Sequence, residues 1–366
     1  NGVSILKQLS VSNGTPDTVA GLSITLNAKP AFCRSKTWTI DRLNPGDEIV
    51  LSDLKLELDH SFLSGLNEAE IGHIEVSCEA DGDVVCDQVM EIELLARDEW
   101  GGLGDMSQLL AAYVSPNHSV VAAILKEASR LLESAGHNGA IDGYQSKDPQ
   151  RAWMLSGAIW SAITGMGLSY ANPPASFESR GQKVRDPQRI KSEGLTTCLD
   201  SSLLLAACFE ASGMHPVVLF SSGHAWVGVW LQPLDFGTVT EFEILNVRKA
   251  VDAQELILLE STLLTHRPTV GLKEAADTGR RLVNEEHETE YAAAIDIARA
   301  RAARIRPLAS YFASNTSDAA EQIEAAPASL PAELSFNSLP GDTIEVEPTD
   351  AQGRIERWQR KLLDLS

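Results

Sequence analysis

Apolar and polar side chains alternate in short runs over the first 97 residues, and turn-forming residues separate the runs. Asn13-Gly14, Asn44-Pro45-Gly46 and Asp81-Gly82 are such turns. Period-two alternation bounded by turns predicts short strands. The expected strands lie at 4–13, 21–28, 36–43, 48–58, 73–80 and 84–96.

Evenly spaced short strands favour an all-β sandwich of immunoglobulin-like type over residues 1–97. No cluster of catalytic residue types occurs in this segment, which we interpret as a spacer or interaction module. Cys78 and Cys86 flank a hairpin turn, so they are expected to lie opposite each other. Because neither a C-x-x-C pair nor a zinc spacing is present, we expect two small buried side chains there.

From about residue 105 the apolar positions recur at helical spacing. Asn117 is expected to cap the second helix, and 171–190 reads as a polar, Pro-containing loop. The expected elements are helices at 149–165, 198–212 and 287–305 and strands at 216–221, 224–231 and 256–264. Helices gathered before an antiparallel sheet predict an α+β domain over 105–310.

The C-terminal region changes composition. Residues 312–338 are rich in Ala, Ser, Pro and Glu and lack large apolar runs, which predicts a linker. Residues 340–366 end in an amphipathic pattern, which we interpret as the start of a following helical domain. Since the sequence begins at Asn1 and ends within that pattern, we expect a piece of a longer protein.

The net charge of the chain limits the classes of molecule that it is expected to bind. The 366 residues carry a formal net charge of −21, so we expect no direct nucleic-acid binding by this fragment. No apolar run reaches the roughly 18 residues of a membrane helix, so no membrane partner is expected. Five cysteines, an odd number, without a signal peptide predict a reducing cytoplasm. No metal site or cofactor is expected.

Cys198 has the strongest chemical context. Thr196 and Thr197 are good N-cap residues and Gly213 is a good helix stop, so Cys198 should open a buried helix. The partial positive charge at a helix N-terminus stabilises a thiolate, which is the nucleophilic form of cysteine. Cys208 lies ten residues further along with no base nearby and is expected in the core.

A base and an orienting group can be assigned downstream. The strand HAWVGVWL alternates, with His224 and Trp226 on one face, and Gly223 before it is expected to allow close backbone approach. His224 is the expected base. Glu260 interrupts an apolar strand, and hydrogen bonding to His224 would satisfy its carboxylate. Asp252 and Asn246 are the alternatives.

An acyl-transfer site also needs donors for an oxyanion. The backbone N–H of Cys198 is one expected donor. The side-chain amide of Gln182, in RGQKVR just upstream, is a second candidate. The expected catalytic set is therefore Cys198, His224, Glu260 and Gln182.

The order of these features resembles transglutaminase-like domains. The matching motifs are Thr196-Thr197-Cys198, His224-Ala225-Trp226 and Glu260-Ser261-Thr262, and Glu260 stands where that family usually has Asp. The resemblance implies a papain-like fold with a Cys–His–carboxylate triad and a cysteine protease activity. The motifs are most specific over 194–231.

A narrower resemblance concerns the order of domains. WGGLG, DGYQS, GQKVR and the terminal RIERWQRKLLDLS resemble the N-terminal region of large bacterial proteins. In these, a β-sandwich and a transglutaminase-like domain precede a helicase-type ATPase and a very-short-patch-repair-like nuclease. The resemblance implies that those C-terminal domains are partners within one chain, and it implies a role in phage defence.

Two functions follow from the residues and the resemblance together. The first is a cysteine-dependent acyl-transfer enzyme, either a peptidase or isopeptidase or a transamidase, acting on a peptide or protein. The alternative is a catalytically inactive transglutaminase-like module that binds or regulates. A Cys198–His224–Glu260 cluster open to a groove would favour the enzyme, and a site plugged by Trp226 or by 171–190 would favour the module.

Overall fold

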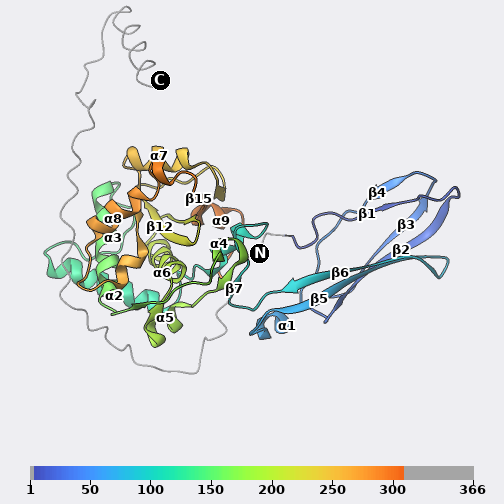
Figure 1. Cartoon of the computed structure of the whole chain (residues 1–366), viewed down its shortest axis with the longest axis horizontal. Coiled ribbons are helices and arrows are strands. Elements are labelled where there is room, and N and C mark those ends of the chain that lie inside the picture. Colours follow the sequence, from blue (N-terminus) through green and yellow to red (C-terminus); the bar gives the residue numbers. More distant parts are fainter. Residues whose placement is uncertain (1–3, 309–366) are drawn as a thin grey trace, which may run out of the picture. The chain divides into compact units, whose positions relative to one another are not determined.

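A computed structural model describes residues 4–308, which form a mixed α+β architecture with several sheets (Figure 1). The expected linker at 312–338 and the expected helical start at 340–366 lie outside the described residues. Within the described part, no helix combines the length and the apolar character needed to cross a bilayer.

The N-terminal β module has two antiparallel sheets. The larger one has the strand order β3-β2-β5-β6, with bounds β2 (Val19–Lys29), β3 (Lys36–Leu43), β5 (Glu70–Ala80) and β6 (Asp83–Leu94). The smaller one pairs β1 (Ser10–Ser12) with β4 (Glu48–Val50), and helix α1 (His60–Gly65) precedes β5. Apolar side chains of both sheets pack together, among them Leu22, Ile24, Val11 and Ile49.

The predicted positions of these strands are confirmed, but two of them are shorter than expected. The segments expected at 4–13 and 48–58 each contribute only three residues to a strand. Asp53 has a φ of 55°, which interrupts extended backbone soon after β4. Cys78 and Cys86 are directly opposite, as expected, and both are free thiols. The expectation that Cys86 is buried is wrong, because β6 is an edge strand and Cys86 is exposed.

The rest of the described chain is built on a five-stranded antiparallel sheet of order β13-β15-β11-β12-β14. Helix α6 (Cys198–Ala211) packs against its strands β11 and β12, and helices α2 and α3 pack against α6 (Figure 1). The sheet strands are β11 (Pro216–Ser221), β12 (His224–Trp230), β13 (Thr240–Glu241), β14 (Leu256–Leu259) and β15 (Tyr291–Asp296). The other elements are η1 (Ser107–Tyr113), α2 (Ser119–Ser134), α3 (Pro149–Thr164), α7 (Ile244–Asp252), η2 (Ser261–Thr265), α8 (Leu272–Arg281), η3 (Glu285–His287) and α9 (Ile297–Ala302).

The expected helix at 287–305 is wrong. Residues 291–296 form strand β15 between β11 and β13, and only Ile297–Ala302 is helical. Ala293 and Ala294 are fully buried in this inner strand. Alanine favours helices intrinsically, but tertiary pairing overrides that preference when a narrow side chain is needed between packed layers.

Two further boundaries differ from the expectation. Helix α2 is capped by His118, whose Nδ1 accepts the N–H of Val120, and Asn117 is not its cap. Strand β14 ends at Leu259, so the expected strand 256–264 is only half extended, and Glu260 opens the 3-10 helix η2 instead.

The segment expected as a loop at 171–190 is folded in part. It contains α4 (Phe177–Arg180), β9 (Gln182–Lys183) and the start of α5 (Pro187–Glu193), and β9 pairs with β7 (Glu99–Trp100). Gly181 has a φ of +84°, and a Cβ there would lie 1.9 Å from the carbonyl oxygen of Trp100. Only glycine allows this approach. Just before and after this segment, β8 (Ser169–Tyr170) pairs in parallel with β10 (Leu195–Thr196).

Candidate active site

Helix α6 begins at Cys198, as the sequence predicts. Thr197 is its N-cap, and a capping box is complete because Thr197 Oγ1 accepts the N–H of Asp200 at 3.1 Å. In return Asp200 Oδ2 accepts the N–H of Thr197 at 3.0 Å. Cys198 thus occupies the first helical position, where the unpaired backbone N–H groups give partial positive charge.

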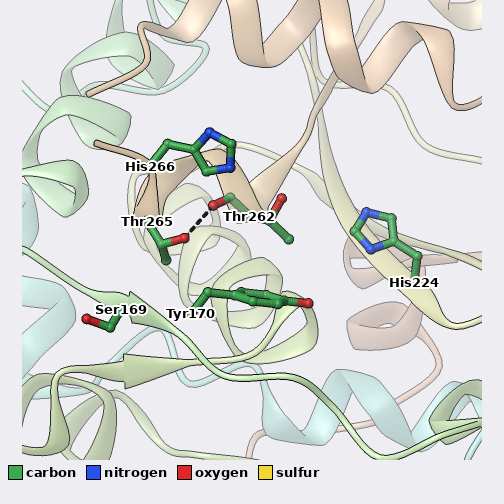
Figure 2. Close-up of a pocket in the computed structure, with 6 residues that line it drawn as sticks. All are labelled: Ser169, Tyr170, His224, Thr262, Thr265 and His266. Carbon is green, nitrogen blue, oxygen red and sulfur yellow. Dashed lines mark hydrogen bonds between the residues drawn. The ribbon is translucent and has the colours of Figure 1, made fainter. Parts of the chain in front are cut away.

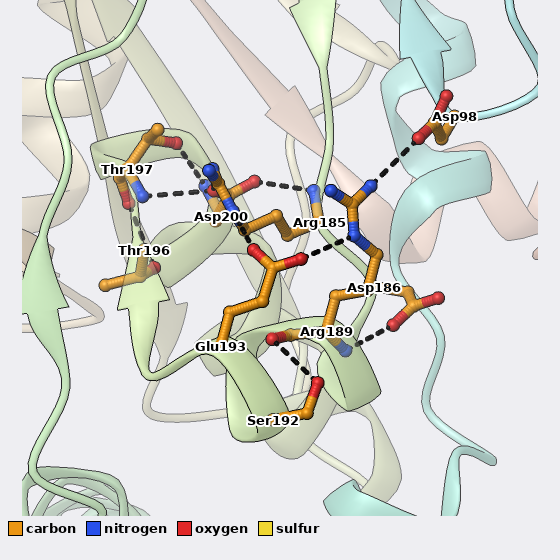
Figure 3. A network of polar contacts seen from close by, with 9 residues as sticks. All are labelled: Asp98, Arg185, Asp186, Arg189, Ser192, Glu193, Thr196, Thr197 and Asp200. Carbon is orange, nitrogen blue, oxygen red and sulfur yellow. Dashed lines mark hydrogen bonds and ion pairs between the residues drawn. The ribbon is translucent and has the colours of Figure 1, made fainter. Parts of the chain in front are cut away.

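The carboxylate of Asp200 is fully buried and is the centre of a polar network (Figure 3). Its Oδ1 accepts the N–H of Arg185 at 2.9 Å, and its Oδ2 lies 3.1 Å from Arg185 Nη1. Glu193 also pairs with Arg185, at 2.9 Å, and Arg189 joins Glu193 to Asp98 at 3.1 Å each. The start of the nucleophile helix is therefore tied to β9, to α5 and to the chain before β7.

His224 is the first residue of β12 and follows a tight turn at Ser222-Gly223. Gly223 has a φ of +68°, and no atom lies within 4 Å of where its Cβ would be. The expectation that Gly223 serves close approach is therefore wrong, because the turn itself needs its left-handed conformation. The imidazole stacks on Trp226, with ring centroids 5.8 Å apart and planes 15° apart.

Glu260 lies where β14 ends and η2 begins. His224 Nε2 donates to Glu260 Oε2 at 2.7 Å, while Glu260 Oε1 accepts the N–H and the hydroxyl of Thr262 at 2.9 and 2.7 Å. Both carboxylate oxygens are thus satisfied although the side chain is only 7% exposed. Of the alternatives, Asp252 pairs with Arg280 and Asn246 bonds Glu241, and neither bonds His224.

The side chains of Cys198 and His224 lie close enough to interact electrostatically. Since Nε2 is occupied by Glu260, Nδ1 is the ring nitrogen left for the thiol. Burial by itself lowers the pKa of His224, but the hydrogen bonds and charges of Cys198 and Glu260 outweigh it and raise the pKa to about 10. Burial also opposes ionisation of Glu260, yet the contacts with His224 and Thr262 lower the pKa of that carboxyl. An imidazolium next to a carboxylate is the stable state at neutral pH.

Tyr170 is the functional residue that sequence reasoning missed. Its hydroxyl lies close to Cys198 and interacts with the thiol side chain and with the backbone of that residue. Burial, followed by the Cys198 contacts, raises the pKa of Tyr170. Cys198 itself has no exposed surface.

A pocket of about 610 Å³ lies beside the triad (Figure 2). Figure 2 shows the hydroxyl end of Tyr170 directed toward His224. The lining is polar and consists of Ser169, Tyr170, His224, Thr262, Thr265 and His266. The pocket is therefore lined by the base, whereas the buried Cys198 is not among its lining residues.

Gln182 does not line this pocket. It is 4% exposed, and its Nε2 lies 3.4 Å from Thr197 Oγ1, one residue before the nucleophile. Its Oε1 has no hydrogen-bond partner within the described residues. The structure thus brings Cys198, His224 and Glu260 together and leaves Gln182 beneath the helix start with one spare amide atom.

The remaining candidate groups lie elsewhere. Cys208 is fully buried in α6, and burial raises the pKa of its thiol, in keeping with a core position. No cluster of three or more His, Cys, Asp or Glu within residues 4–308 has the arrangement needed to hold a metal ion.

In comparisons with known proteins, the chain matches no protein-family model and no curated protein.

Replacing Arg185 by alanine should destabilise the fold, because the buried Asp200 would lose the guanidinium that pairs with it. Removing one member of a buried ion pair costs about 3–5 kcal/mol in other proteins. We expect a loss of free energy of unfolding near 3 kcal/mol, since Asp200 keeps two backbone N–H donors. Arg189→Ala is the matched control, because its pairs are partly exposed and should be worth at most about 1 kcal/mol. Equal losses in urea unfolding of the two variants would contradict this account.

Glu260→Gln should lower the pKa of His224, because the imidazolium loses its ionised acceptor. The folded pKa of about 10 lies above the ordinary value of 6.5, so this pair stabilises the fold fully below pH 6.5. That stability is lost as the pH rises toward 10. NMR titration of the His224 ring should show the decrease. Glu290→Gln, which removes the partner of the more exposed His287, should leave the His224 titration unchanged.

Proposed function

We propose that this chain carries a cysteine-dependent acyl-transfer site, with Cys198 as nucleophile, His224 as acid and base, and Glu260 as the group that orients the imidazole. The observation that carries the proposal is the 2.7 Å hydrogen bond between His224 and Glu260 beside Cys198 at the start of α6, with the three side chains supplied by separate elements. A cysteine paired with an imidazolium at a helix N-terminus is the arrangement that activates a thiol for attack on a carbonyl.

The reaction can be written with these groups. The Cys198 thiolate attacks a carbonyl carbon, and the carbonyl oxygen takes the negative charge. The tetrahedral intermediate collapses, the C–N bond breaks, and the His224 imidazolium gives its proton to the leaving amine. Water or a second amine then attacks the thioester while His224 takes back a proton. Water gives a peptidase or isopeptidase and an amine gives a transamidase.

The position of Tyr170 helps to locate the proposed oxyanion site. An oxyanion must sit beside the nucleophile and accept from the N–H of Cys198. In the described conformation the Tyr170 hydroxyl interacts with Cys198. We propose that a substrate carbonyl oxygen replaces this hydroxyl, so that the tyrosine must move for turnover. The Nε2 amide group of Gln182 is the second proposed donor; it lies 3.4 Å from Thr197 Oγ1, beside the residue before the nucleophile, and has to release that contact to serve the oxyanion.

The fold assignments belong to the same proposal. An α helix that carries the nucleophile at its N-terminus and packs against an antiparallel sheet that carries the base supports a papain-like, transglutaminase-like domain over 105–310. The two packed antiparallel sheets before it support an immunoglobulin-like sandwich over 1–97. The setting we propose is a bacterial cytoplasmic helicase-nuclease protein that acts in phage defence, with a protein or peptide as substrate.

A second candidate is a binding or regulatory module that does not turn over. One observation favours it, which is the complete burial of Cys198 beneath Tyr170. A site that stays closed would leave only the pocket beside His224 for a ligand. The two candidates differ in whether the thiol can be reached, and labelling can measure this.

Iodoacetamide should alkylate Cys198 at pH below about 7, because the protonated His224 stabilises the thiolate there. In His224→Ala this labelling should be lost at the same pH. Peptide mapping by mass spectrometry separates the Cys198 signal from that of exposed Cys86, which serves as the internal reference in each sample.

Labelling of Cys198 that rises only near an ordinary thiol value of about 8.5, equally in both proteins, would overturn the enzyme proposal. No labelling at any pH, with Cys86 fully modified, would favour the closed binding module.

Tyr170→Phe should speed the alkylation of Cys198, because the ring stays but the hydrogen bond to the thiol is gone. A hydrogen bond worth about 1 kcal/mol corresponds to roughly a fivefold change in rate. Thr265→Ala is the matched control, since Thr265 lines the pocket and bonds the carbonyl of Thr262 without contacting the thiol. Slower labelling in Tyr170→Phe would mean that the hydroxyl activates Cys198 and does not cover it.

A further inference from the structure

Strand β6 is a long edge strand without a neighbour on one side. It runs for twelve residues, Asp83–Leu94, at the end of the sheet order β3-β2-β5-β6. Its backbone pairs only with β5 among the described strands. Natural edge strands are usually short, or are interrupted by proline or by bulges. β6 contains no proline, and its pairing with β5 shifts only at Cys78/Glu79.

The core-facing side of β6 is only partly buried. Ile74 and Cys78 on β5 are buried, but the residues directly opposite them on β6, Met90 and Cys86, are exposed. Over residues 86–90 the module's core therefore stops one strand short of the sheet's edge, whereas Leu94 at the end of β6 is buried and Ile92 packs against the core. On the other face of β6, Val89 is 57% exposed. Exposed apolar side chains on both faces of an edge strand mark a surface that another strand can cover.

The charge around this edge has one sign. Between Glu70 and Leu94 the sequence holds eight acidic residues and no lysine or arginine. On β6 itself the acids are Asp83, Asp87, Glu91 and Glu93. None of these four forms an ion pair with another residue of the described range 4–308. Three of them, Asp87, Glu91 and Glu93, lie on the same face as Val89.

The free edge and the acidic charge of β6 indicate which kind of molecule pairs with it. Pairing β6 with β6 of a second copy would bring like charges face to face, which is unfavourable. A nucleic acid is excluded for the same reason. A strand whose one face is basic would meet Asp87 and Glu91, and its apolar other face would cover Met90. We propose that β6 is a docking edge that takes an extended segment of another protein, with alternating basic and apolar residues, as a fifth strand.

The test uses the full chain and a fluorescein-labelled peptide of about nine residues in which lysine and valine alternate. Fluorescence anisotropy should show saturable binding that weakens as salt is added. The same peptide with all its main-chain nitrogens methylated should not bind, because it has no N–H group left to donate to β6. A glutamate–valine peptide should not bind either. Hydrogen exchange should show added protection at the amides of β6.

The matched variants reverse exposed charges on two edges of one sheet. Asp87→Lys together with Glu91→Lys should weaken binding about tenfold or more, since two attractive pairs become repulsive. Asp41→Lys changes an exposed acid on β3, at the opposite edge, and should leave binding unchanged. All changed side chains are exposed, so the variants should unfold at the temperature of the parent.

Three results would overturn the proposal. Equal binding of the methylated peptide would mean attraction of charge without strand pairing. Equal weakening by Asp41→Lys would place the peptide elsewhere on the acidic surface. Absence of saturable binding, or dimerisation of the chain that Asp87→Lys abolishes, would mean that β6 does not serve a basic partner strand.

Discussion

The buried carboxylate of Asp200 is the constraint on which the site depends. It lies at the third position of α6, where it completes the capping box with Thr197 and accepts two contacts from Arg185. A charge with no exposure is tolerated only when its hydrogen-bonding capacity is filled. The residues that fill it come from the helix start and from the segment after β9. Moving any of them would move the backbone of Cys198.

Opposing effects also determine the charge of the His224 imidazole. Burial opposes the charged imidazole, and two hydrogen-bonded partners favour it, with the partners prevailing. Glu260 can act as one of these partners because the chain leaves β14 at this residue and turns, so that Thr262 satisfies its second oxygen. Glutamate reaches the imidazole from the end of strand β14.

The sequence predicts the parts of this arrangement that depend on local pattern. The positions of Cys198 at a capped helix and of His224 at an alternating strand can both be predicted, because a helix start and a strand period are properties of neighbouring residues. Glu260 can be predicted as the partner of His224 because it is a carboxylate within an apolar run. Tyr170 has no such pattern, since it lies in a two-residue strand whose position is fixed by pairing with β10.

Long-range packing also explains where the fold expectations fail. The charged and alanine-rich stretch after 287 has a helical composition, yet its alanines are needed inside a sheet. The partnership of Asp200 with Arg185 spans fifteen residues and two short elements, so no local pattern contains it. Cys86 resembles a buried thiol by residue type, and its exposure depends only on β6 being the last strand of its sheet.

The central proposal is that the charged imidazole of His224 activates Cys198 as the nucleophile by stabilising its thiolate form. The ultraviolet absorbance of the thiolate measures this directly, as a difference between the parent chain and Cys198→Ser at neutral pH. The account predicts a thiolate band in the parent that is absent from Cys198→Ser and strongly reduced in His224→Ala. Identical spectra for the parent and Cys198→Ser at neutral pH would contradict it.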